Sequence, residues 1–143
     1  MKAQTIFFFK ENIRFRLLNQ DSLRAWILSR VKKAGYSISN INFIFCSDSY
    51  LRKMNKEYLE HDYNTDIITF DNSIVKKEII GDVFISIDRV TANAKNYSVT
   101  FNDELHRVMA HGVLHLLGYG DKNEKQKEVM RRMENEWLGK RGF

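Results

Sequence analysis

Hydrophobic and polar positions follow two different periods along the chain, and the changes of period predict nine elements. Short runs of β-branched and aromatic residues indicate strands, and apolar residues three and four positions apart indicate helices. Strands are expected at residues 5–9, 42–46, 65–70 and 79–87. Helices are expected at residues 21–34, 48–58, 88–97, 101–117 and 122–138, with Ser47 or Asp48 as the cap of the second.

The order of these elements predicts the fold class. A strand–helix–strand unit favours parallel pairing, whereas the adjacent third and fourth strands favour an antiparallel edge. We therefore expect an α/β (α+β) fold, a small mixed four-stranded sheet packed with helices, as a single domain over residues 1–143. Phe7, Phe8 and Phe9 are expected in the core, as part of a central strand with both faces buried.

Composition narrows the class of protein. Hydrophobic residues make up 43% of the chain and aromatic residues 13%, which argues against a disordered protein. The single cysteine, Cys46, excludes an intrachain disulfide and a cysteine-rich zinc site, and its place in a strand indicates a small buried hydrophobe. Neither a membrane span nor a signal peptide is found, so we expect a cytoplasmic protein with no membrane partner.

The net charge of +5 is concentrated in the first third of the chain. A basic segment of this kind can attract a polyanion. Ordinary solvated charges around a helix also explain it, so the charge by itself identifies no partner.

One helix carries the residues with the clearest chemistry. His111 and His115 are four positions apart, so both side chains project from the same side of the helix. Two imidazoles placed in this way can bind one metal ion. Gly118 can end the helix and turn the chain back, which brings Asp121 within reach as a third ligand. Three protein ligands leave an open position for water, as a catalytic metal site requires.

Each of these features also has a structural interpretation. A histidine pair at this spacing occurs by chance on many helices, and Asp121 followed by Glu124 forms a capping box for the last helix. Gly112 stands where a His-Glu-x-x-His metalloprotease has its general base, which disfavours peptide hydrolysis. Glycine inside a helix costs about 1 kcal/mol relative to alanine, so Gly112 indicates close approach of another segment.

The segment from His111 to Asp121 resembles a known family signature. It is similar to the His-Gly-x-Leu-His-Leu-x-Gly-Tyr-Asp-His pattern of the bacterial YbeY family of endoribonucleases, also called rRNA maturation factors. Residues 54–58 and 64–70 are similar to the family's Leu-Asn-x-x-Tyr-Arg and Pro-Thr-Asp-Val-Leu-Ser-Phe patterns, and residues 80–86 resemble its Leu-Gly-Asp-Ile strand. The matches occur in the same order as in the family.

The resemblance implies a fold related to zinc metalloproteases, with a metal helix that binds one divalent ion, Zn²⁺. It places the three ligands at His111, His115 and Asp121. It also implies metal-dependent cleavage of single-stranded RNA in 16S rRNA maturation and ribosome quality control, with ribosomal RNA and the ribosome as partners. The oligomeric state does not follow from it.

Four positions depart from the family pattern. Gly120 and Asp121 replace the usual aspartate and histidine, Leu59 stands in place of an arginine considered important for activity, and Asn64 replaces proline. A carboxylate in place of an imidazole lowers the net charge of the site by one, so water at the metal is acidified less, and iron suits the ligands as well as zinc. Loss of the arginine removes a bidentate phosphate clamp, for which Lys53 and Lys56 are candidate substitutes.

No motif identifies the general acid or base. Asp66 is the candidate catalytic residue, and the alternative is a strand residue that hydrogen-bonds the local backbone. Glu104 is interpreted as a helix-start charge, His106 as structural, and His61 as a solvated loop residue. The basic residues of the last helix, Lys122 among them, could contact RNA phosphates, but the interleaved glutamates, Glu134 among them, favour a solvated face.

Two other functions stay open on the residues alone. One is a metal-dependent hydrolase or oxygenase that acts on a small substrate. The other is a non-catalytic, ribosome-associated module whose metal is structural. An open coordination position and metal-dependent cleavage of single-stranded RNA would separate the nuclease from both.

Overall fold

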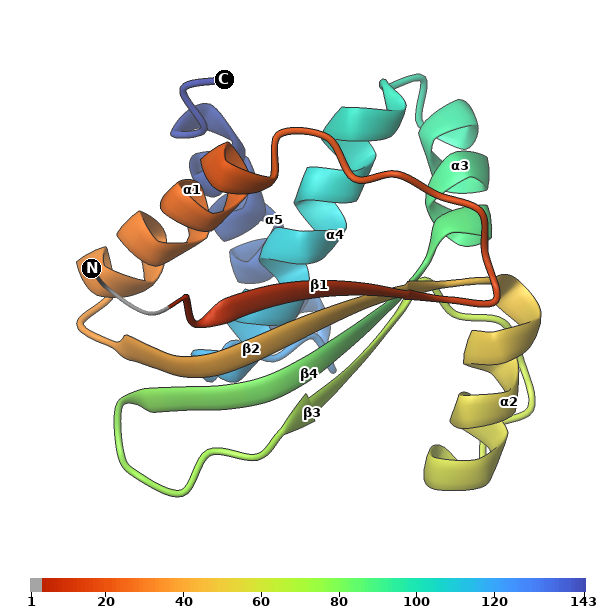
Figure 1. The fold of residues 1–143 in the computed structure, drawn as a ribbon, viewed down its shortest axis with the longest axis horizontal. Helices are drawn as coiled ribbons and strands as arrows, with labels where there is room; N and C mark the ends of the chain where they lie inside the picture. Colours follow the sequence, from red (N-terminus) through yellow and green to blue (C-terminus); the bar gives the residue numbers. More distant parts are fainter. Residues whose placement is uncertain (1–3) are drawn as a thin grey trace.

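Four strands form one mixed sheet in the computed structural model, which describes residues 4–143. The strands are β1 (Ile6–Glu11), β2 (Ser37–Cys46), β3 (Ile67–Asp71) and β4 (Glu78–Ser86), in the spatial order β1-β2-β4-β3 (Figure 1). β1 is parallel to β2 and β2 to β4, whereas β3 is an antiparallel edge strand on β4. The expected mixed sheet with an antiparallel edge is confirmed.

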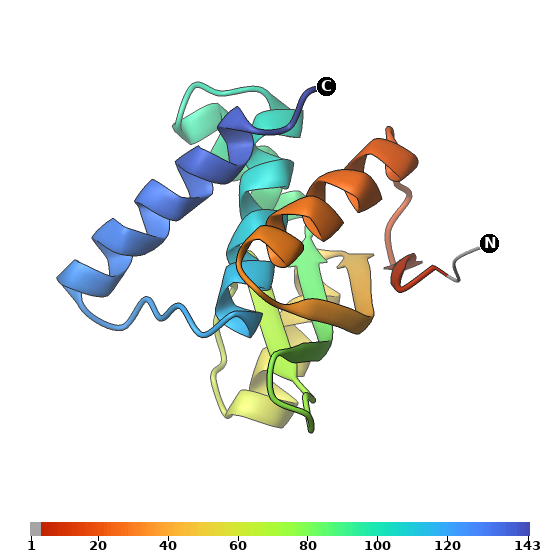
Figure 2. The ribbon, with the colours of Figure 1, turned by 90° about the vertical axis from the view of Figure 1, so that its left-hand side faces the viewer.

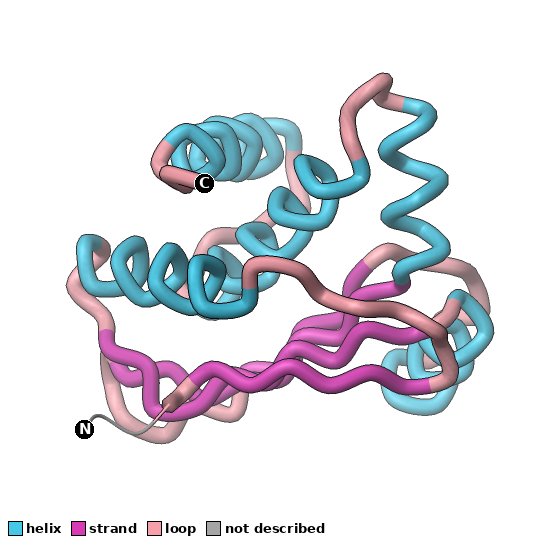
Figure 3. Tube along the Cα trace, turned by 45° about the horizontal axis from the view of Figure 1, so that its top comes forward, coloured by secondary structure: helices cyan, strands magenta, loops and turns pink. Residues whose placement is uncertain are grey.

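Helices lie on both faces of the sheet. They are α1 (Gln20–Lys33), α2 (Asp48–Leu59), α3 (Ile87–Asn96), α4 (Phe101–Leu116) and α5 (Glu124–Gly139). α1 and α4 lie on one face and α5 packs on the outer side of α4 (Figures 1 and 2), whereas α2 lies against the opposite face near one end of the sheet (Figure 3). The order of elements is the predicted one. Within residues 4–143, no helix has the length and apolar character needed to cross a bilayer.

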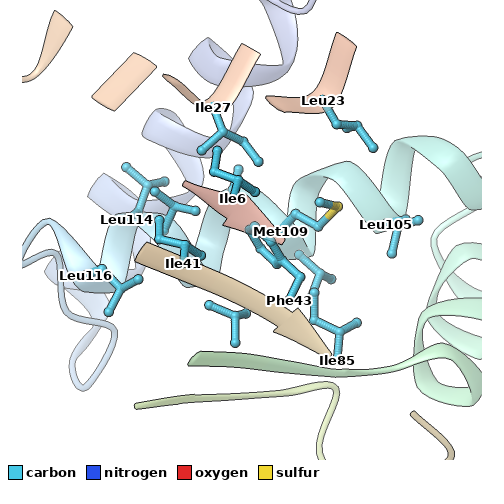
Figure 4. Close-up of a cluster of buried hydrophobic side chains, with 14 of the residues drawn as sticks. Ile6, Leu23, Ile27, Ile41, Phe43, Ile85, Leu105, Met109, Leu114 and Leu116 are labelled. Carbon is cyan, nitrogen blue, oxygen red and sulfur yellow. The ribbon is translucent and has the colours of Figure 1, made fainter. Parts of the chain in front are cut away.

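The alternation of side chains along β2 builds the main core. Ile41, Phe43 and Phe45 all point toward the face that α1 and α4 cover, and all are buried. Figure 4 shows Ile41 and Phe43 beneath Met109 of α4. Burial of one such side chain stabilises the fold by about 1.5–3 kcal/mol, so this face holds α4 firmly on the sheet.

A smaller cluster lies on the opposite face, under α2. Cys46 is completely buried there with Leu51 of α2 and Ile68 of β3. Burial, helped by the nearby charges of Asp48 and Asp88, raises the pKa of the Cys46 thiol to about 12. Its interpretation as a small buried hydrophobe is confirmed.

The expected position of Phe7, Phe8 and Phe9 in a central strand is wrong. β1 is an edge strand, and Phe9 is 51% exposed. Phe8 packs against the core, with its ring centroid 5.8 Å from that of Phe43. An edge strand has only one neighbour, and which strand takes the edge depends on pairing between distant segments, which a local run of apolar residues does not reveal.

α4 starts and packs as its sequence predicts. Thr100 caps it, because its side-chain oxygen accepts a hydrogen bond of 3.1 Å from the backbone N–H of Asp103. A Cβ atom on Gly112 would lie only 2.7 Å from Cγ1 of Val83 and 3.0 Å from Cδ1 of Ile67. The absent side chain therefore lets α4 approach the sheet closely, and packing explains this glycine.

Candidate metal centre

The last turns of α4 present both histidines to the same side. The side chains of His111 and His115 are 17% and 27% exposed, so each is partly shielded yet reachable from solvent. The helix ends at Leu116, and Gly118 then takes a left-handed conformation with φ of 100°, which glycine adopts without strain. This turn sends the chain back past the helix and brings Asp121 beside the two rings.

Three ligand atoms form a nearly equilateral triangle at this point. The Nε2 atoms of His111 and His115 are 3.0 Å apart, and each lies 3.3 Å from Oδ2 of Asp121. A tetrahedral zinc ion with bonds of about 2.0–2.1 Å to nitrogen and oxygen places its ligand atoms about 3.3 Å apart. The three residues can therefore hold one such ion, with a fourth position left open.

The capping interpretation of Asp121 is wrong. α5 begins at Glu124, and its cap is Asn123, whose Oδ1 atom accepts a hydrogen bond of 2.9 Å from the backbone N–H of Gln126. One residue, Lys122, separates Asp121 from this cap, so the Asp121 carboxylate is not needed at the start of the helix. It points instead to the two imidazoles.

A buried carboxylate orients the first histidine. Glu134 of α5 is 1% exposed, and its Oε2 atom accepts a hydrogen bond of 2.6 Å from Nδ1 of His111. This bond leaves Nε2 with its lone pair directed toward His115 and Asp121, as a metal ligand requires. Burial alone would raise the pKa of Glu134, but the hydrogen bond from His111 and the charge of Arg107 outweigh it and hold that pKa below its usual value.

The contact with Glu134 shifts the pKa of His111 in the opposite direction. Burial alone would lower its pKa, but the hydrogen bond and charge of Glu134, with further contributions from Asp121 and Asp66, raise it. The surroundings of His111 are therefore strongly negative, which favours a bound cation as well as a proton.

Arg107 connects the Glu134 carboxylate to that of Glu104. Its Nη1 atom donates to Oε1 of Glu134 at 3.0 Å, and its Nε atom donates to Oε1 of Glu104 at 2.8 Å. A second contact joins Nη2 to Oε2 of Glu104, so this pair is bidentate. Since Glu104 is only 2% exposed, a buried chain of charges runs from it through Arg107 and Glu134 to His111.

The sequence did not predict this buried series of charged residues. Glu104 does lie in the first turn of α4, as interpreted, but it is also buried and paired with Arg107. The interpretation of Glu134 as part of a solvated face is wrong, because Glu134 is buried and paired with Arg107. A signal existed, because Glu104, Arg107 and His111 follow one another at helical spacing on one side of α4. Glu134 likewise lies between Met130 and Trp137 on the buried side of α5.

A cavity of about 690 Å³ opens in front of the three ligand residues. Its lining comes from the end of α2, the loop that follows it, β3, α4 and the loop after α4: Leu59, His61, Thr65–Thr69, Asp71, Arg107, Val108, His111, His115, Leu116, Asp121 and Lys122. This volume falls within the range of small-ligand sites.

Asp66 lines this cavity directly before β3 begins. Burial raises the pKa of its carboxyl group above the usual value, against the opposing charges of Arg107 and His111 and a hydrogen bond from its own backbone N–H. Asp66 therefore has features of both sequence interpretations, since it hydrogen-bonds local backbone and also shares a cavity with the metal ligands.

His106 lies away from the site, as expected. It is 4% exposed, and its Nδ1 atom accepts a hydrogen bond of 2.9 Å from Nη1 of Arg141. Burial, reinforced by the charge of Arg141, lowers the pKa of His106 to about 4. A neutral imidazole packed against the Trp26 ring fits a structural role.

The cations beside the cavity are not the two lysines considered as substitutes for the family arginine. Lys53 and Lys56 are exposed on α2 and do not line the cavity, and Lys53 faces Glu57 at 4.0 Å. Lys122 and Arg107 line it instead. Lys122 follows Asp121 directly, so the turn that brings Asp121 to the histidines also brings Lys122 to the cavity.

Comparison with known proteins decides the family. The family model "Endoribonuclease YbeY" matches residues 9–142. The protein named "Endoribonuclease YbeY" from Cytophaga hutchinsonii is 56% identical over 143 residues, covering 100% of both chains. That from Amoebophilus asiaticus is 44% identical over 138 residues, 96% of this chain and 94% of the relative.

The chain belongs to the YbeY family. Among solved structures, the solution structure of TM1509 from Thermotoga maritima is similar in fold, with a TM-score of 0.68 and 23% identity over 96% of this chain and 89% of that one. Membership confirms the resemblance found in the motifs, and the predicted α/β fold agrees with both the structure and this likeness.

The structure accommodates two departures of this YbeY chain from its family pattern. At Gly120, a Cβ atom would lie 2.7 Å from Oε1 of Gln126, the same atom that accepts a hydrogen bond from the backbone N–H of Lys122. Gln126 therefore braces the loop in the space that a larger residue would need. Leu59 lies on the cavity lining and is 42% exposed, so an apolar side chain occupies the position of the usual arginine.

Proposed function

We propose that this chain is a metal-dependent, single-strand-specific endoribonuclease that acts in 16S rRNA maturation and ribosome quality control. The observation that carries the proposal is the triangle of His111, His115 and Asp121 atoms beside an accessible cavity, in a member of an endoribonuclease family. Relatives that match the whole chain bear the name of that activity.

We infer that the resident ion is Zn²⁺, held by His111, His115 and Asp121. Two imidazoles and one carboxylate suit zinc, and the spacing of their atoms fits its bond lengths. The bound ion would supply positive charge that stabilises the negative charge developing on the phosphate. Glu134 keeps the Nε2 lone pair of His111 aimed at that position.

Lys122 is the residue that we assign to the RNA backbone. Arg107 also lines the cavity, but Glu104 and Glu134 already engage its guanidinium group. Lys122 has no carboxylate within 4.0 Å among the described residues, and it is exposed at the mouth of the cavity. Its ammonium group can therefore bind a phosphate next to the scissile one.

The experiment that tests the proposed function measures cleavage of a labelled single-stranded RNA by the purified, metal-loaded chain. We expect cleavage that a chelator abolishes and zinc restores, with little cleavage of the same sequence in a duplex. Chelator-resistant cleavage would contradict the metal requirement. Absence of cleavage with every divalent ion would contradict the nuclease and favour a small-substrate hydrolase or a non-catalytic module.

We further propose that Asp66 is the general base, whose carboxylate accepts the proton of the attacking oxygen. A raised pKa brings a carboxylate closer to the operating pH, where general bases work best. Replacement by asparagine keeps the shape but not the basicity, so Asp66→Asn is expected to lower kcat about 10²–10⁴-fold with metal content unchanged.

The matched control for Asp66 is Asp71→Asn, which removes another carboxylate that lines the cavity and is exposed. Single-turnover cleavage rates of both variants should be compared with that of the unmodified chain. Equal rates for the two variants would assign Asp66 to the local backbone of β3 and leave the general base elsewhere.

A further inference from the structure

The loop between α2 and β3 is tied to α2 by three contacts at the rim of the cavity. Asn55 of α2 is only 2% exposed, and its Nδ2 atom donates to the backbone oxygen of Tyr63 at 3.1 Å. The backbone N–H of His61 donates to the backbone oxygen of Asn55, also at 3.1 Å. Arg52 and Asp62 add an ion pair of 2.9 Å, so three contacts tie the loop to α2.

Two aromatic rings in this loop form a preorganised stack. The rings of His61 and Tyr63 are nearly parallel, at 19°, with centroids 5.2 Å apart. The Tyr63 hydroxyl and Nδ1 of His61 lie 3.1 Å apart and share a hydrogen bond. Both residues are exposed, and Tyr63 reaches 55%. The two rings therefore orient each other while their surfaces stay accessible to a ligand.

The stack lies next to the candidate metal centre. His61 lines the same cavity as His111, His115 and Asp66, and Figure 2 shows the loop after α2 passing near the end of α4. Leu59, also on this side of the cavity, adds an apolar surface. This side offers the flat His61 ring, on which Tyr63 stacks from outside the lining, and an aliphatic side chain, which suit a nucleobase better than a phosphate.

We propose that His61 and Tyr63 form a platform on which a nucleobase of single-stranded RNA stacks while an adjoining phosphodiester lies at the metal centre. The inference rests on the proposed function and extends it to the binding of a base. Stacking tolerates every base because each has a flat π face, so the platform selects unpaired nucleotides rather than a sequence. A duplex keeps its bases stacked internally and cannot use it.

The test compares His61→Ala and Tyr63→Ala with Tyr97→Ala, which removes an equally exposed tyrosine at the end of α3 that does not line the cavity. The measured quantities are the Kd for a single-stranded 2′-O-methyl oligonucleotide, which keeps bases and phosphates, and KM and kcat for RNA cleavage. We expect each platform variant to raise Kd and KM about five- to a hundredfold with kcat nearly unchanged. Tyr63→Phe retains the stack and is expected to have a smaller effect.

An oligonucleotide with one abasic position separates stacking from general weakening. The abasic position is moved along the strand. At one position it should lower the affinity of the unmodified protein, but cause no further loss of affinity in His61→Ala, which already lacks the stacking ring. The platform would be overturned if His61→Ala and Tyr63→Ala had the same Kd and KM as Tyr97→Ala. It would also be overturned if the abasic substitution lowered the affinity of the unmodified protein and of His61→Ala equally at every position. A chain that binds through His61 but cleaves nothing would contradict the nuclease and leave the platform standing.

Discussion

Replacing His111 or His115 by alanine is expected to remove the bound metal and to lower RNA cleavage by about a thousandfold or more. Their Nε2 atoms are 3.0 Å apart and supply two of the three ligand atoms in the triangle. A metal ion contributes several kcal/mol to the stabilisation of charge in the transition state, which corresponds to a rate factor of this size. Elemental analysis and single-turnover kinetics on the same preparation measure both effects.

His115→Ala is the more informative of the two variants. Its ring has no hydrogen bond to Glu134, so its removal leaves the buried chain of charges intact and the protein folded. Asp121→Ala should also lose metal, whereas Asp71→Ala, which removes an exposed carboxylate from the same cavity, should retain it. Cleavage that survives in folded His115→Ala, or full metal content in Asp121→Ala, would contradict the assigned ligands.

Glu134→Gln is expected to weaken metal binding about 10–100-fold and to lower the free energy of unfolding by about 1–3 kcal/mol. Glu134 now accepts from two donors, Nδ1 of His111 and Nη1 of Arg107. A glutamine has one acceptor oxygen at these positions, so its amide nitrogen must face one of the two donors. If it faces His111, the ring changes tautomer and its Nε2 atom becomes protonated, which prevents coordination.

The control for this prediction is Glu136→Gln on the same helix. Glu136 is exposed, so its replacement makes the same chemical change but leaves the buried series of charges from Glu104 to His111 intact. Zinc affinity by competition with a chromophoric chelator measures the first effect, and urea unfolding of the metal-free protein measures the second. Equal zinc affinities for Glu134→Gln and Glu136→Gln would show that Glu134 does not position His111.

The candidate site was only partly predictable from the residues. The common direction of His111 and His115 follows from helical geometry, which spans only four residues. Asp121 had two local interpretations of similar merit, and only the actual cap at Asn123 separated them. The residue type could not separate the two interpretations, because a capping box and a metal ligand require the same short polar side chain.

The burial of Glu134 illustrates a different limit. Helical spacing from Met130 and Trp137 places it on the inner side of α5, yet a buried carboxylate is strongly unfavourable without a partner. Its partners, Arg107 and His111, lie on α4, 27 and 23 residues away. The pairing exists only after α4 and α5 pack together, so the sequence pattern could not distinguish it from a charged surface position.

The order of the nine elements in residues 4–143, the mixed character of the sheet and the helix that carries His111 and His115 followed from the sequence itself, because period, capping and spacing are local properties. The tertiary structure decided which strands are central, and it exposed Phe9 on the edge strand β1. It also brought His61, Asp66 and Lys122 to one cavity with His111. These outcomes depend on contacts between segments far apart in the chain, whose free energies are set by packing rather than by neighbouring residues.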